Sequence, residues 1–351
     1  MSKQAESEAL HLRARAFVAA FERDDEMPEA FDTLAKDIAD FQARNITGYA
    51  RLRAARKEDI PAVPTDAFKV TRVSVFAEAE TPFVFRTSGT TVGARGSHWF
   101  RTCETYDLGA VAFGRDVLGV ADRTEVLVVG PTPLEQPDSS LVHMIGTFVD
   151  TLATAATVED TYFISDGVLD VVALDDRVAR LLMSSAKNTI VLGTSLAFAL
   201  LLEAFGEAKF RMPEGTRVMQ TGGFKGRTLE FDAAKLRRDL ARAFCIEESA
   251  IISEYGMTEL SSQFWETSPN IYAEPPWARV VPVDPETLAP VKYGDVGVAR
   301  IEDLLNVDSA VAIVTADRVR RVKEGFELLG REAGAPPRGC SIATEEMLGP
   351  S

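Results

Sequence analysis

The feature that most constrains this chain is a regular alternation of strand-like and helix-like segments between residues 83 and 314. The strand-like runs are short and mostly apolar: Phe83–Phe85, Glu125–Val129, Thr189–Leu192, Arg217–Gln220, Ala250–Ser253 and Ala310–Val314. Helix-like runs lie between them, for example Thr105–Leu118, Ser140–Thr154, Leu174–Ser185 and Ala233–Phe244. Strands that alternate with helices predict an α/β fold with a largely parallel sheet.

Two regions of different character flank this alternating part. Residues 5–58 predict helices, because apolar side chains recur mostly at three- and four-residue spacing until Pro61 and Pro64. Residues 330–351 are rich in Gly and Pro at their start and predict an appendage. We therefore expect three regions: a helical N-terminal region at 1–60, a main α/β domain at 61–331, and a tail at 332–351 that carries Cys340.

Composition narrows the classes of partner. The 351 residues include 38 Lys and Arg and 53 Asp and Glu, which gives a net charge of −15. Binding to nucleic acid or to an anionic membrane surface needs clustered cations, so this acidity argues against both.

The three cysteines lack CxxC spacing and predict neither a disulfide framework nor a zinc site. Because no signal peptide and no apolar run of about 20 residues is visible, the sequence predicts a cytoplasmic protein without membrane insertion.

The first segment that carries chemistry is residues 86–96, which read R-T-S-G-T-T-V-G-A-R-G after the strand-like Phe83–Phe85. Glycines let backbone amides approach a phosphate closely, and short hydroxyl side chains add donors. Arg95 adds a fixed positive charge. These features favour a loop that cradles ATP phosphates, although the pattern is not that of a Walker A loop. A Ser/Thr/Gly surface loop is the alternative. The candidate phosphate-binding residues are Thr87, Ser88, Gly89, Thr90, Thr91 and Arg95.

A second segment, Ser253–Glu259, reads S-E-Y-G-M-T-E and follows the strand-like Ala250–Ile252. In open α/β sheets, ligands bind at the carboxyl ends of strands. An aromatic, a hydroxyl and a carboxylate leave this strand end together: Tyr255 can stack on a base, Thr258 can bond a phosphate, and Glu259 can hold Mg²⁺ through oxygen. A strand-to-loop turn with a solvated Glu is the alternative interpretation.

Taken together and in this order, the two segments resemble the adenylate-forming superfamily of acyl-CoA synthetases, peptide-synthetase adenylation domains and luciferases. The superfamily's loop reads S/T-S-G-T-T-G-x-P-K-G, and this chain keeps its spacing with Val92, Ala94 and Arg95 in place of Gly, Pro and Lys. Arg for Lys preserves charge but not shape. The resemblance implies the fold of the superfamily's N-terminal domain, with mixed and parallel sheets and flanking helices. It also implies use of ATP and of Mg²⁺ held by Glu259.

Further segments between residues 83 and 331 resemble superfamily positions. Leu141–Gly146 resembles a His-x-x-Gly segment beside the acyl pocket, and Thr221–Gly223 resembles the glycine strand end that borders the adenylate. Thr315–Asp317 resembles T-G-D, whose Asp bonds both ribose hydroxyls, and Leu329–Arg331 resembles the G-R that opens the hinge. Each segment alone is typical of a core strand and its turn. The series implies nucleotide contacts at Gly222, Gly223, Tyr255, Gly256, Asp317 and Arg331, and acyl contacts at His143, Gly146, Phe224 and Met257.

The end of the chain departs from most of the superfamily, whose members continue into a lid domain with a catalytic Lys. Only 20 residues follow Arg331, so no C-terminal lid domain is expected. Length, the helical N-terminus, Ile60–Pro64 before Phe68 and the run Tyr255–Phe264 resemble one subfamily, the LuxE-type acyl-protein synthetases. In that family a fatty acid is adenylated, carried on a Cys near the C-terminus, and passed to a reductase. The matching residue is Cys340.

The physics of the tail allows this role. Cys340 lies nine residues after Arg331, and an extended tether of that length reaches at most ~30 Å. Gly and Pro residues between positions 334 and 339 argue against a regular helix there, and Arg338 is placed to lower the pKa of the thiol. An inert Cys in a partly packed tail is the alternative.

We therefore expect an ATP-dependent ligase that activates a carboxylic acid as acyl-AMP and transfers it to Cys340, with Arg95, Thr258 and Glu259 as the other catalytic residues. A fatty acid and an acyl-accepting partner, either a reductase or a carrier protein, are implied by the resemblance alone. An alternative acceptor is coenzyme A or a carrier-protein pantetheine. A third possibility is a lidless fold that acts as a binding subunit. His11 is expected to be solvated, and His98 to approach phosphate or to pack at the surface.

Overall fold

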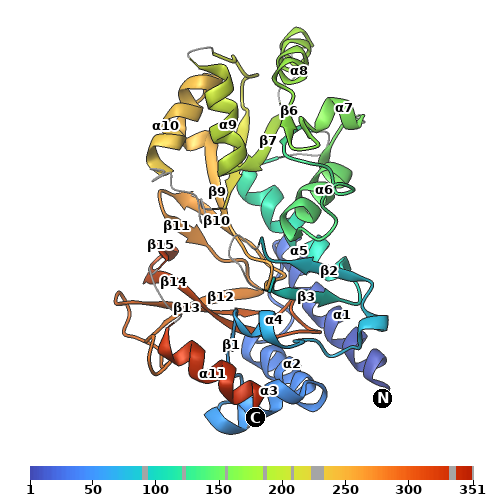
Figure 1. The fold of residues 1–351 in the computed structure, drawn as a ribbon, viewed down its shortest axis with the longest axis vertical. Coiled ribbons are helices and arrows are strands. Elements are labelled where there is room, and N and C mark those ends of the chain that lie inside the picture. Colours follow the sequence, from blue (N-terminus) through green and yellow to red (C-terminus); the bar gives the residue numbers. More distant parts are fainter. Residues whose placement is uncertain are drawn as a thin grey trace. The chain divides into compact units, whose positions relative to one another are not determined.

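The computed structural model describes residues 1–88, 94–120, 124–154, 157–184, 188–206, 209–222, 233–331 and 337–349 (Figure 1). The chain divides into two compact units. Unit 1 comprises Met1–Phe113 and Met257–Ser351, and unit 2 comprises Gly114–Gly256. Helix α5 (Glu104–Leu118) contains the point where the chain passes from unit 1 to unit 2.

Unit 1 begins with three helices, which confirms the expected helical N-terminus: α1 (Lys3–Glu22), α2 (Phe31–Asn45) and α3 (Thr47–Arg56). Their apolar spacing buries one side of each helix, as Phe17 and Ile38 show. Two short helices follow, α4 (Ala67–Val70) and η1 (Glu78–Glu80). His11 of α1 is buried, contrary to expectation. Its ring nitrogens bond the Thr105 hydroxyl at 2.8 Å and the Asp308 carboxylate at 3.1 Å, which replaces the water it would otherwise need.

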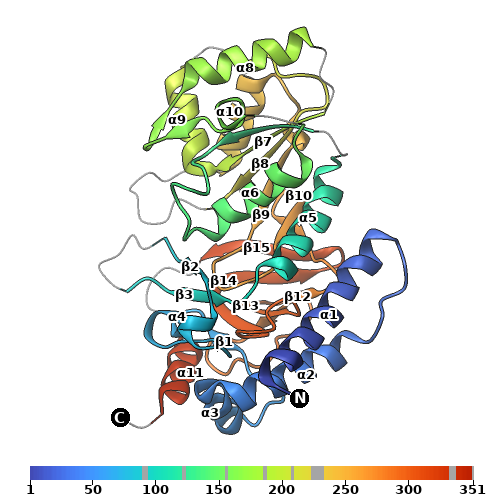
Figure 2. The same cartoon turned by 90° about the vertical axis from the view of Figure 1, so that its right-hand side faces the viewer.

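Six strands in the described part of unit 1 form a sheet in the order β12–β13–β14–β15–β11–β10, with antiparallel neighbours. Their bounds are β10 (Phe264–Ser268), β11 (Ile271–Ala273), β12 (Ala278–Val283), β13 (Val296–Asp303), β14 (Ala312–Val322) and β15 (Gly325–Arg331). Strand β1 (Val63–Pro64) pairs parallel to β14. Strands β2 (Phe83–Arg86) and β3 (Ser97–Phe100) form a separate antiparallel hairpin. Helix α11 (Arg338–Leu348) packs on α3 and β1 (Figures 1 and 2).

Unit 2 is built on four parallel strands in the order β9–β8–β7–β4. Their bounds are β4 (Glu125–Val129), β7 (Thr189–Thr194), β8 (Arg217–Thr221) and β9 (Ile251–Tyr255). The helices are α6 (Ser140–Leu152), α7 (Val158–Thr161), α8 (Val171–Met183), α9 (Ser195–Phe205), α10 (Ala233–Phe244) and η2 (Glu248–Ala250), and β5 (Ile164–Ser165) pairs with β6 (Val168–Leu169). Apolar residues of α8, α9 and α10 form one buried cluster with β4, β7 and β8 (Figure 2).

The predicted α/β fold class with mixed sheets and flanking helices is confirmed, and each expected strand and helix overlaps an observed one. The parallel strands lie mainly in unit 2, where burial on both faces produces the continuous apolar runs that the sequence displays. Most of the antiparallel strands of unit 1 were not expected. Charged residues such as Arg300 and Glu302, which pair at 3.0 Å, interrupt the apolar pattern of those strands.

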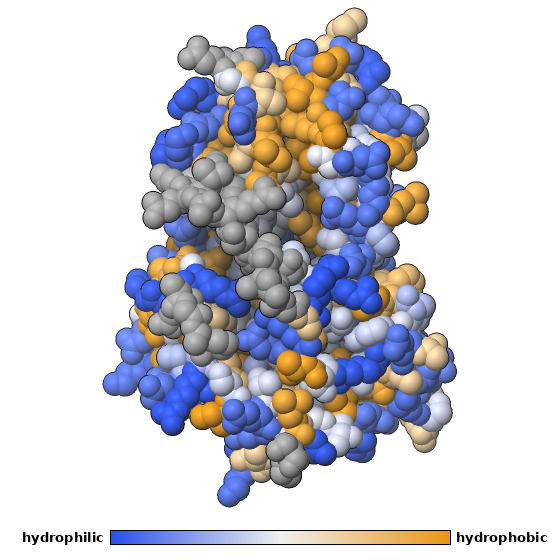
Figure 3. All heavy atoms as spheres, viewed as in Figure 1, coloured by the Kyte–Doolittle hydropathy of each residue, from blue (hydrophilic) through white to orange (hydrophobic). Residues whose placement is uncertain are grey.

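The surface of unit 2 carries apolar side chains in the upper part of Figure 3, where Figure 1 places α8 and α9. The large exposed apolar residues of these two helices are Val172, Leu182, Met183 and Leu200. Within the described part of the chain, no helix has the length and apolar character that crossing a bilayer requires.

Candidate active site

The β2–β3 hairpin holds the two ends of the candidate phosphate loop together. The Thr87 amide donates to the Gly96 carbonyl at 2.9 Å, and the Gly96 amide donates to the Thr87 hydroxyl at 2.9 Å. We call this closed base, formed by Thr87 and Gly96, the loop neck. Ser88 follows it, whereas the predicted residues Gly89, Thr90 and Thr91 lie outside the described residues. The neck therefore fixes where the loop starts and ends.

The Arg95 side chain bonds the backbone where the loop begins. Its guanidinium donates to the backbone carbonyl of Thr87 at 2.7 Å and to that of Arg86 at 3.2 Å. A guanidinium has five N–H donors and keeps its charge at all relevant pH values. The structure thus places the predicted positive charge at the base of the loop, where it also supports the backbone.

Glu259 lies at the same neck. It belongs to a turn closed by the bond from the Leu260 amide to the Met257 carbonyl at 3.1 Å. Its Oε1 atom is 3.6 Å from the position that a Cβ atom on Gly96 would take, and the residue is only 5% exposed. Unit 1 therefore brings together two predicted segments that are more than 150 residues apart in sequence, the loop and the Thr258–Glu259 pair. Carboxylate oxygens and phosphates are groups that can hold Mg²⁺ between them, so this position suits the predicted role of Glu259.

The buried side chain of His98 bonds the backbone of this turn. The ring is 1% exposed, and its Nδ1 atom lies 2.8 Å from the Thr258 carbonyl oxygen. Because a carbonyl can only accept, Nδ1 carries the proton. Burial lowers the pKa of His98 to about 4, so the ring is neutral near pH 7. Of the two expectations for His98, packing is therefore confirmed, although in the interior and not at the surface.

Two residues that sequence reasoning missed, Asp303 and Asn306, hold the rest of the turn. Asn306 donates to the Glu259 carbonyl at 2.9 Å and accepts from the Ser261 hydroxyl at 2.6 Å. Asp303 accepts from the Ser261 amide at 2.8 Å and from the Ser262 hydroxyl at 2.6 Å. Burial raises the pKa of Asp303 to about 6, although these donors oppose the shift. The available signal was that Asp303 and Asn306 are among the few polar residues of the mostly apolar stretch 301–314.

Asp317 and Arg331 occupy facing positions on β14 and β15. The Arg331 Nε atom lies 3.9 Å from Asp317 Oδ1, and the Asp317 amide donates to the Thr315 hydroxyl at 2.9 Å. The structure therefore brings the two residues predicted for the ribose and phosphate next to one another. A bulge in the pairing between Asp317 and Val319 interrupts the regular ladder at this point.

Two predicted residues of unit 2, Gly222 and Tyr255, lie at the carboxyl edge of its parallel sheet. The register aligns Thr194, Thr221 and Glu254 across neighbouring strands, so Gly222 and Tyr255 follow at the same edge. The Ser195 hydroxyl donates to the Gly222 carbonyl at 2.8 Å. Gly222 has a φ of +79°, which favours glycine. Gly223 and Phe224 lie outside the described residues.

Glu254 is a buried carboxyl that sequence reasoning did not select. It bonds the hydroxyl of Thr221 on the neighbouring strand. Burial raises its pKa to about 7, against an ordinary value of 4.5. With a pKa of about 7, this carboxyl is about half protonated near neutral pH.

His143 and Gly146 lie one turn apart on α6. Gly146 packs tightly, because a Cβ atom there would meet the Pro133 ring at 2.7 Å. This contact supplies a packing reason for glycine. The Thr147 hydroxyl donates to the His143 carbonyl at 3.1 Å, a bond within the helix. The acyl contacts predicted for both residues stay a prediction.

Cys340 is the third residue of α11 and is 5% exposed. Burial and the nearby Asp66 raise the pKa of its thiol to about 11, whereas Arg56 opposes the shift. The expected lowering of this pKa by Arg338 is therefore wrong, because burial dominates. The expectation of no regular helix between positions 334 and 339 is also wrong at positions 338 and 339, the first two residues of α11.

Gly339 allows α11 to pack closely against the loop that contains Pro285 and Glu286. A Cβ atom on Gly339 would lie 2.8 Å from the Pro285 carbonyl and 2.9 Å from that of Glu286, so only glycine lets α11 approach this loop. Arg56 of α3 pairs with Glu346 at 2.6 Å and donates to the Gly339 carbonyl at 3.3 Å. Pro337 precedes the first helical residue, a position that tolerates proline.

Comparison with known proteins identifies the family. Residues 52–348 match the sequence profile described as acyl-protein synthetase, LuxE, and this match covers more than half of the chain. The chain belongs to this family. Acyl-protein synthetases are ligases, so membership confirms the predicted enzyme class.

Individual relatives agree with this assignment. A protein from Aliivibrio fischeri named long-chain-fatty-acid–luciferin-component ligase is 23% identical over 312 residues, which cover 83% of this chain and 79% of that one. Among solved structures, an open conformation of 2-hydroxyisobutyryl-CoA ligase with 2-HIB-AMP and CoA has a TM-score of 0.57 at 12% identity. It covers 84% of this chain and 73% of that enzyme. At this identity, the likeness shows only that this chain shares the fold of the ligase.

A second solved structure, ATP-bound MatB from Rhodopseudomonas palustris, has a TM-score of 0.49 at 17% identity and covers 73% of this chain. This chain spans about half, 49%, of the MatB length.

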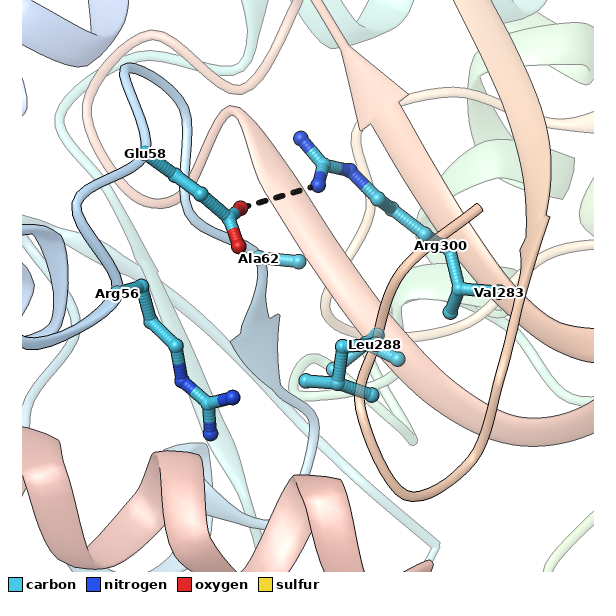
Figure 4. A pocket seen from close by; sticks show the side chains of 7 residues that line it. Arg56, Glu58, Ala62, Val283, Leu288 and Arg300 are labelled. Carbon is cyan, nitrogen blue, oxygen red and sulfur yellow. Dashed lines mark hydrogen bonds and ion pairs between the residues drawn. The ribbon is translucent and has the colours of Figure 1, made fainter. Parts of the chain in front are cut away.

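A small pocket lies next to α11, and neither residue of the loop neck lines it. Its lining residues come from unit 1 (Figure 4): Arg56, Glu58, Ala62, Val283, Leu288, Arg300 and Val314. Glu58 and Arg300 pair across it at 3.2 Å. None of the predicted site residues lines this pocket, so it adds no group to the proposed chemistry.

Proposed function

We propose that this chain activates a fatty acid with ATP as acyl-AMP and then transfers the acyl group to Cys340, which yields an acyl-protein thioester. The observation that carries the proposal is the Glu259 carboxylate beside the loop neck formed by Thr87 and Gly96. Family membership supplies the ligase class, and the name of the Aliivibrio fischeri relative supports a long-chain fatty acid.

Mg²⁺ fits the groups that are present. Mg²⁺ in nucleotide enzymes is bound by one or two carboxylates, by waters and by the substrate phosphates. Glu259 supplies one such carboxylate. The described residues contain no cluster of three or more His, Cys, Asp or Glu that could hold a metal alone, so the metal would arrive with ATP. When bound, it would neutralise charge on the phosphate oxygens.

The chain's own groups would bind and orient the nucleotide. Thr87, Ser88 and the following loop residues would donate to the phosphates, with Arg95 adding positive charge at the loop base. Asp317 would accept from the ribose hydroxyls, and its neighbour Arg331 would approach the phosphate. In unit 2, Tyr255 would stack on the base, and the glycines at 222, 223 and 256 would leave room for close approach. His143, Gly146, Phe224 and Met257 are proposed to contact the acyl group.

In the first step, an oxygen of the fatty-acid carboxylate attacks the α-phosphorus of ATP. The bond from that phosphorus to the bridging oxygen breaks, and pyrophosphate leaves with the electron pair. Charge that builds on the phosphoryl oxygens would be met by Thr258 and Arg95, which is electrostatic stabilisation by groups already in place. No lid lysine takes part in this scheme.

In the second step, the Cys340 thiol loses its proton to solvent, and the thiolate attacks the acyl carbonyl carbon. The carbon–oxygen bond to AMP breaks, AMP leaves and a thioester remains. A thiol with a pKa of about 11 is ionised only to roughly one part in 10⁴ at pH 7. The step therefore requires α11 to expose Cys340.

The burial of Cys340 also favours a second candidate for the acceptor. An external thiol, either coenzyme A or the pantetheine of a carrier protein, would take the acyl group without any movement of α11. The adenylation step is the same in both schemes, so they differ only in whether the protein itself gains mass.

Intact-protein mass spectrometry after incubation with Mg-ATP and a panel of carboxylic acids separates these schemes. The proposal expects a mass gain equal to the acid minus water, which is absent in Cys340→Ser and removed by hydroxylamine. If no gain occurs but AMP forms once coenzyme A or a carrier protein is added, the acceptor is external. If neither a gain nor AMP is found, adenylation is contradicted and a non-catalytic binding subunit is favoured.

A further inference from the structure

His98 and Asn306 stand outside every predicted site, yet both bond the turn that carries Thr258 and Glu259. We infer that these two side chains are positioning residues that hold Thr258 and Glu259 against the loop neck for adenylation. This inference rests on the proposed function. It adds specific residues that set the geometry of the reacting groups.

The argument begins with the two peptide carbonyls. The Thr258 carbonyl accepts from His98 Nδ1 at 2.8 Å, and the next carbonyl along the chain, that of Glu259, accepts from Asn306 Nδ2 at 2.9 Å. Two successive carbonyls held in place fix the orientation of two successive peptide planes. The backbone dihedrals of Glu259 lie between those planes, so the direction of its side chain is set by the same two bonds.

His98 is itself held firmly. It lies on β3 two residues after Gly96, so the strand that leaves the loop neck also carries the donor to Thr258. Its ring packs on Phe100, with centroids 4.1 Å apart, and on Phe68, at 5.8 Å. A ring fixed by packing donates in one direction only. His98 thereby links the neck and the turn through a single side chain.

Asn306 is equally constrained. Its amide nitrogen also donates to the Ala310 carbonyl at 3.0 Å, and its amide oxygen accepts from the Ser261 hydroxyl at 2.6 Å. Its own backbone carbonyl accepts from the buried Gln42 of α2 at 2.8 Å. Both polar atoms of the side chain therefore form hydrogen bonds, and rotation of the side chain would break them.

The alternative is that both side chains merely satisfy buried carbonyls, which would affect stability and leave catalysis intact. Three variants distinguish the two roles. In His98→Asn, the amide nitrogen occupies nearly the place of Nδ1 and can still donate to Thr258. In His98→Gln, the donor moves to the far side of the former ring. His11→Asn is the matched control, because His11 is another buried His of unit 1 that bonds Thr105 and Asp308 instead.

The measurement is ATP–pyrophosphate exchange with a long-chain fatty acid, at varied ATP and Mg²⁺, below the Tm of every variant. We expect His98→Gln to lower kcat roughly tenfold, to raise the Mg²⁺ concentration needed for half-maximal rate, and to leave the KM for the acid unchanged. His98→Asn should recover most of this loss. His11→Asn should lower the Tm without changing kcat.

If His98→Gln does not fold, Asn306→Asp provides the same test, because it keeps the shape of the side chain and removes the donor to Glu259. The inference is overturned if folded His98→Gln or Asn306→Asp keeps the wild-type kcat. It is also overturned if His98→Asn loses as much as His98→Gln, or if His11→Asn loses kcat by the same factor. Exchange that is absent from the wild-type chain with every acid would instead reject the proposed function itself.

Discussion

Glu259 shows how strongly one residue depends on its surroundings. A 5% exposed carboxylate beside Gly96 would be costly unless a cation or a set of donors compensates its charge. In the proposed reaction, a cation that arrives with the nucleotide would contribute to this compensation. The residue is therefore a catalytic candidate on physical grounds as well as by its motif.

We predict that Glu259→Gln lowers the rate of ATP–pyrophosphate exchange on the order of 100-fold, since the amide keeps the volume but cannot ligate a metal as an anion. Glu327→Gln serves as the control. Glu327 of β15 pairs with Arg320 of β14 at 3.3 Å and bonds no proposed site residue in the described structure. Exchange kinetics with saturating acid would make the comparison. Equal rates for the two variants would remove Glu259 from the mechanism.

The raised pKa of Glu254 predicts that the free energy of unfolding depends on pH. This pKa is about 7 in the folded chain and 4.5 ordinarily, so the folded state binds this proton more tightly than the unfolded state does. The resulting stabilisation is complete below pH 4.5 and is lost as the pH rises through 7. By linkage it amounts to about 3 kcal/mol.

A Glu254→Gln variant cannot lose that proton. Its free energy of unfolding, measured in urea between pH 4.5 and 8, should therefore fall less with rising pH than that of the wild type. The difference between the two curves isolates Glu254 from the other carboxylates of this acidic chain. Parallel curves would show that burial does not hold the proton.

Sequence could anticipate some of these residues but not the others. Glu259 and Thr87 belong to segments with recognisable local patterns, and the structure brings both to the loop neck. His98 and Asn306 reach the turn across 160 and 47 residues of chain, so no local pattern signals their contacts. Such long-range hydrogen bonds depend on the completed fold.

At the scale of elements, α11 is the clearest departure from the sequence-based expectation. Local propensity disfavours a helix with Gly339 in its first turn, but tertiary packing outweighs propensity when an apolar face is buried. Cys340, Ala343 and Met347 form that face. The helix thereby conceals the thiol that the proposed reaction uses.

We predict that loosening α11 exposes Cys340. Arg56→Ala removes the ion pair to Glu346 and the bond to the Gly339 carbonyl, which together are worth roughly 1 to 2 kcal/mol. If the thiol reacts only when α11 opens, its alkylation should become roughly 5- to 30-fold faster. Mass-spectrometric mapping of iodoacetamide labelling would report the rate, with the exposed Cys245 as an internal reference.

Arg53→Ala is the matched control for this prediction. Arg53 lies on the same helix, α3, but pairs with Asp40 at 2.6 Å and with Asp59 at 3.4 Å. Its loss should leave the labelling of Cys340 close to the wild-type rate. Similar acceleration in both variants would indicate general loosening of α3, and no acceleration in Arg56→Ala would mean that the ion pair does not hold α11 closed.

At the scale of the whole molecule, the proposed chemistry divides along the chain. The described groups assigned to adenylation end at Arg331, whereas the thiol assigned to acyl transfer lies in the tail at 332–351. Residues 337–349 pack on α3 and β1, both in unit 1. The tail therefore contributes to the stability of unit 1 as well as to the second step, and the two contributions can be separated by removing it.

We predict that a chain ending at Arg331 keeps ATP–pyrophosphate exchange within about threefold of the wild-type rate while self-acylation disappears. Loss of three buried side chains, Cys340, Ala343 and Met347, should also lower the free energy of unfolding by roughly 2 to 5 kcal/mol. Exchange must be measured below the lowered Tm, with circular dichroism to show that the chain is folded. A folded but inactive truncated chain would mean that the tail takes part in adenylation. Retained exchange would instead place the whole first step on residues up to Arg331, with Arg95 as the candidate for the positive charge that meets the reacting phosphate.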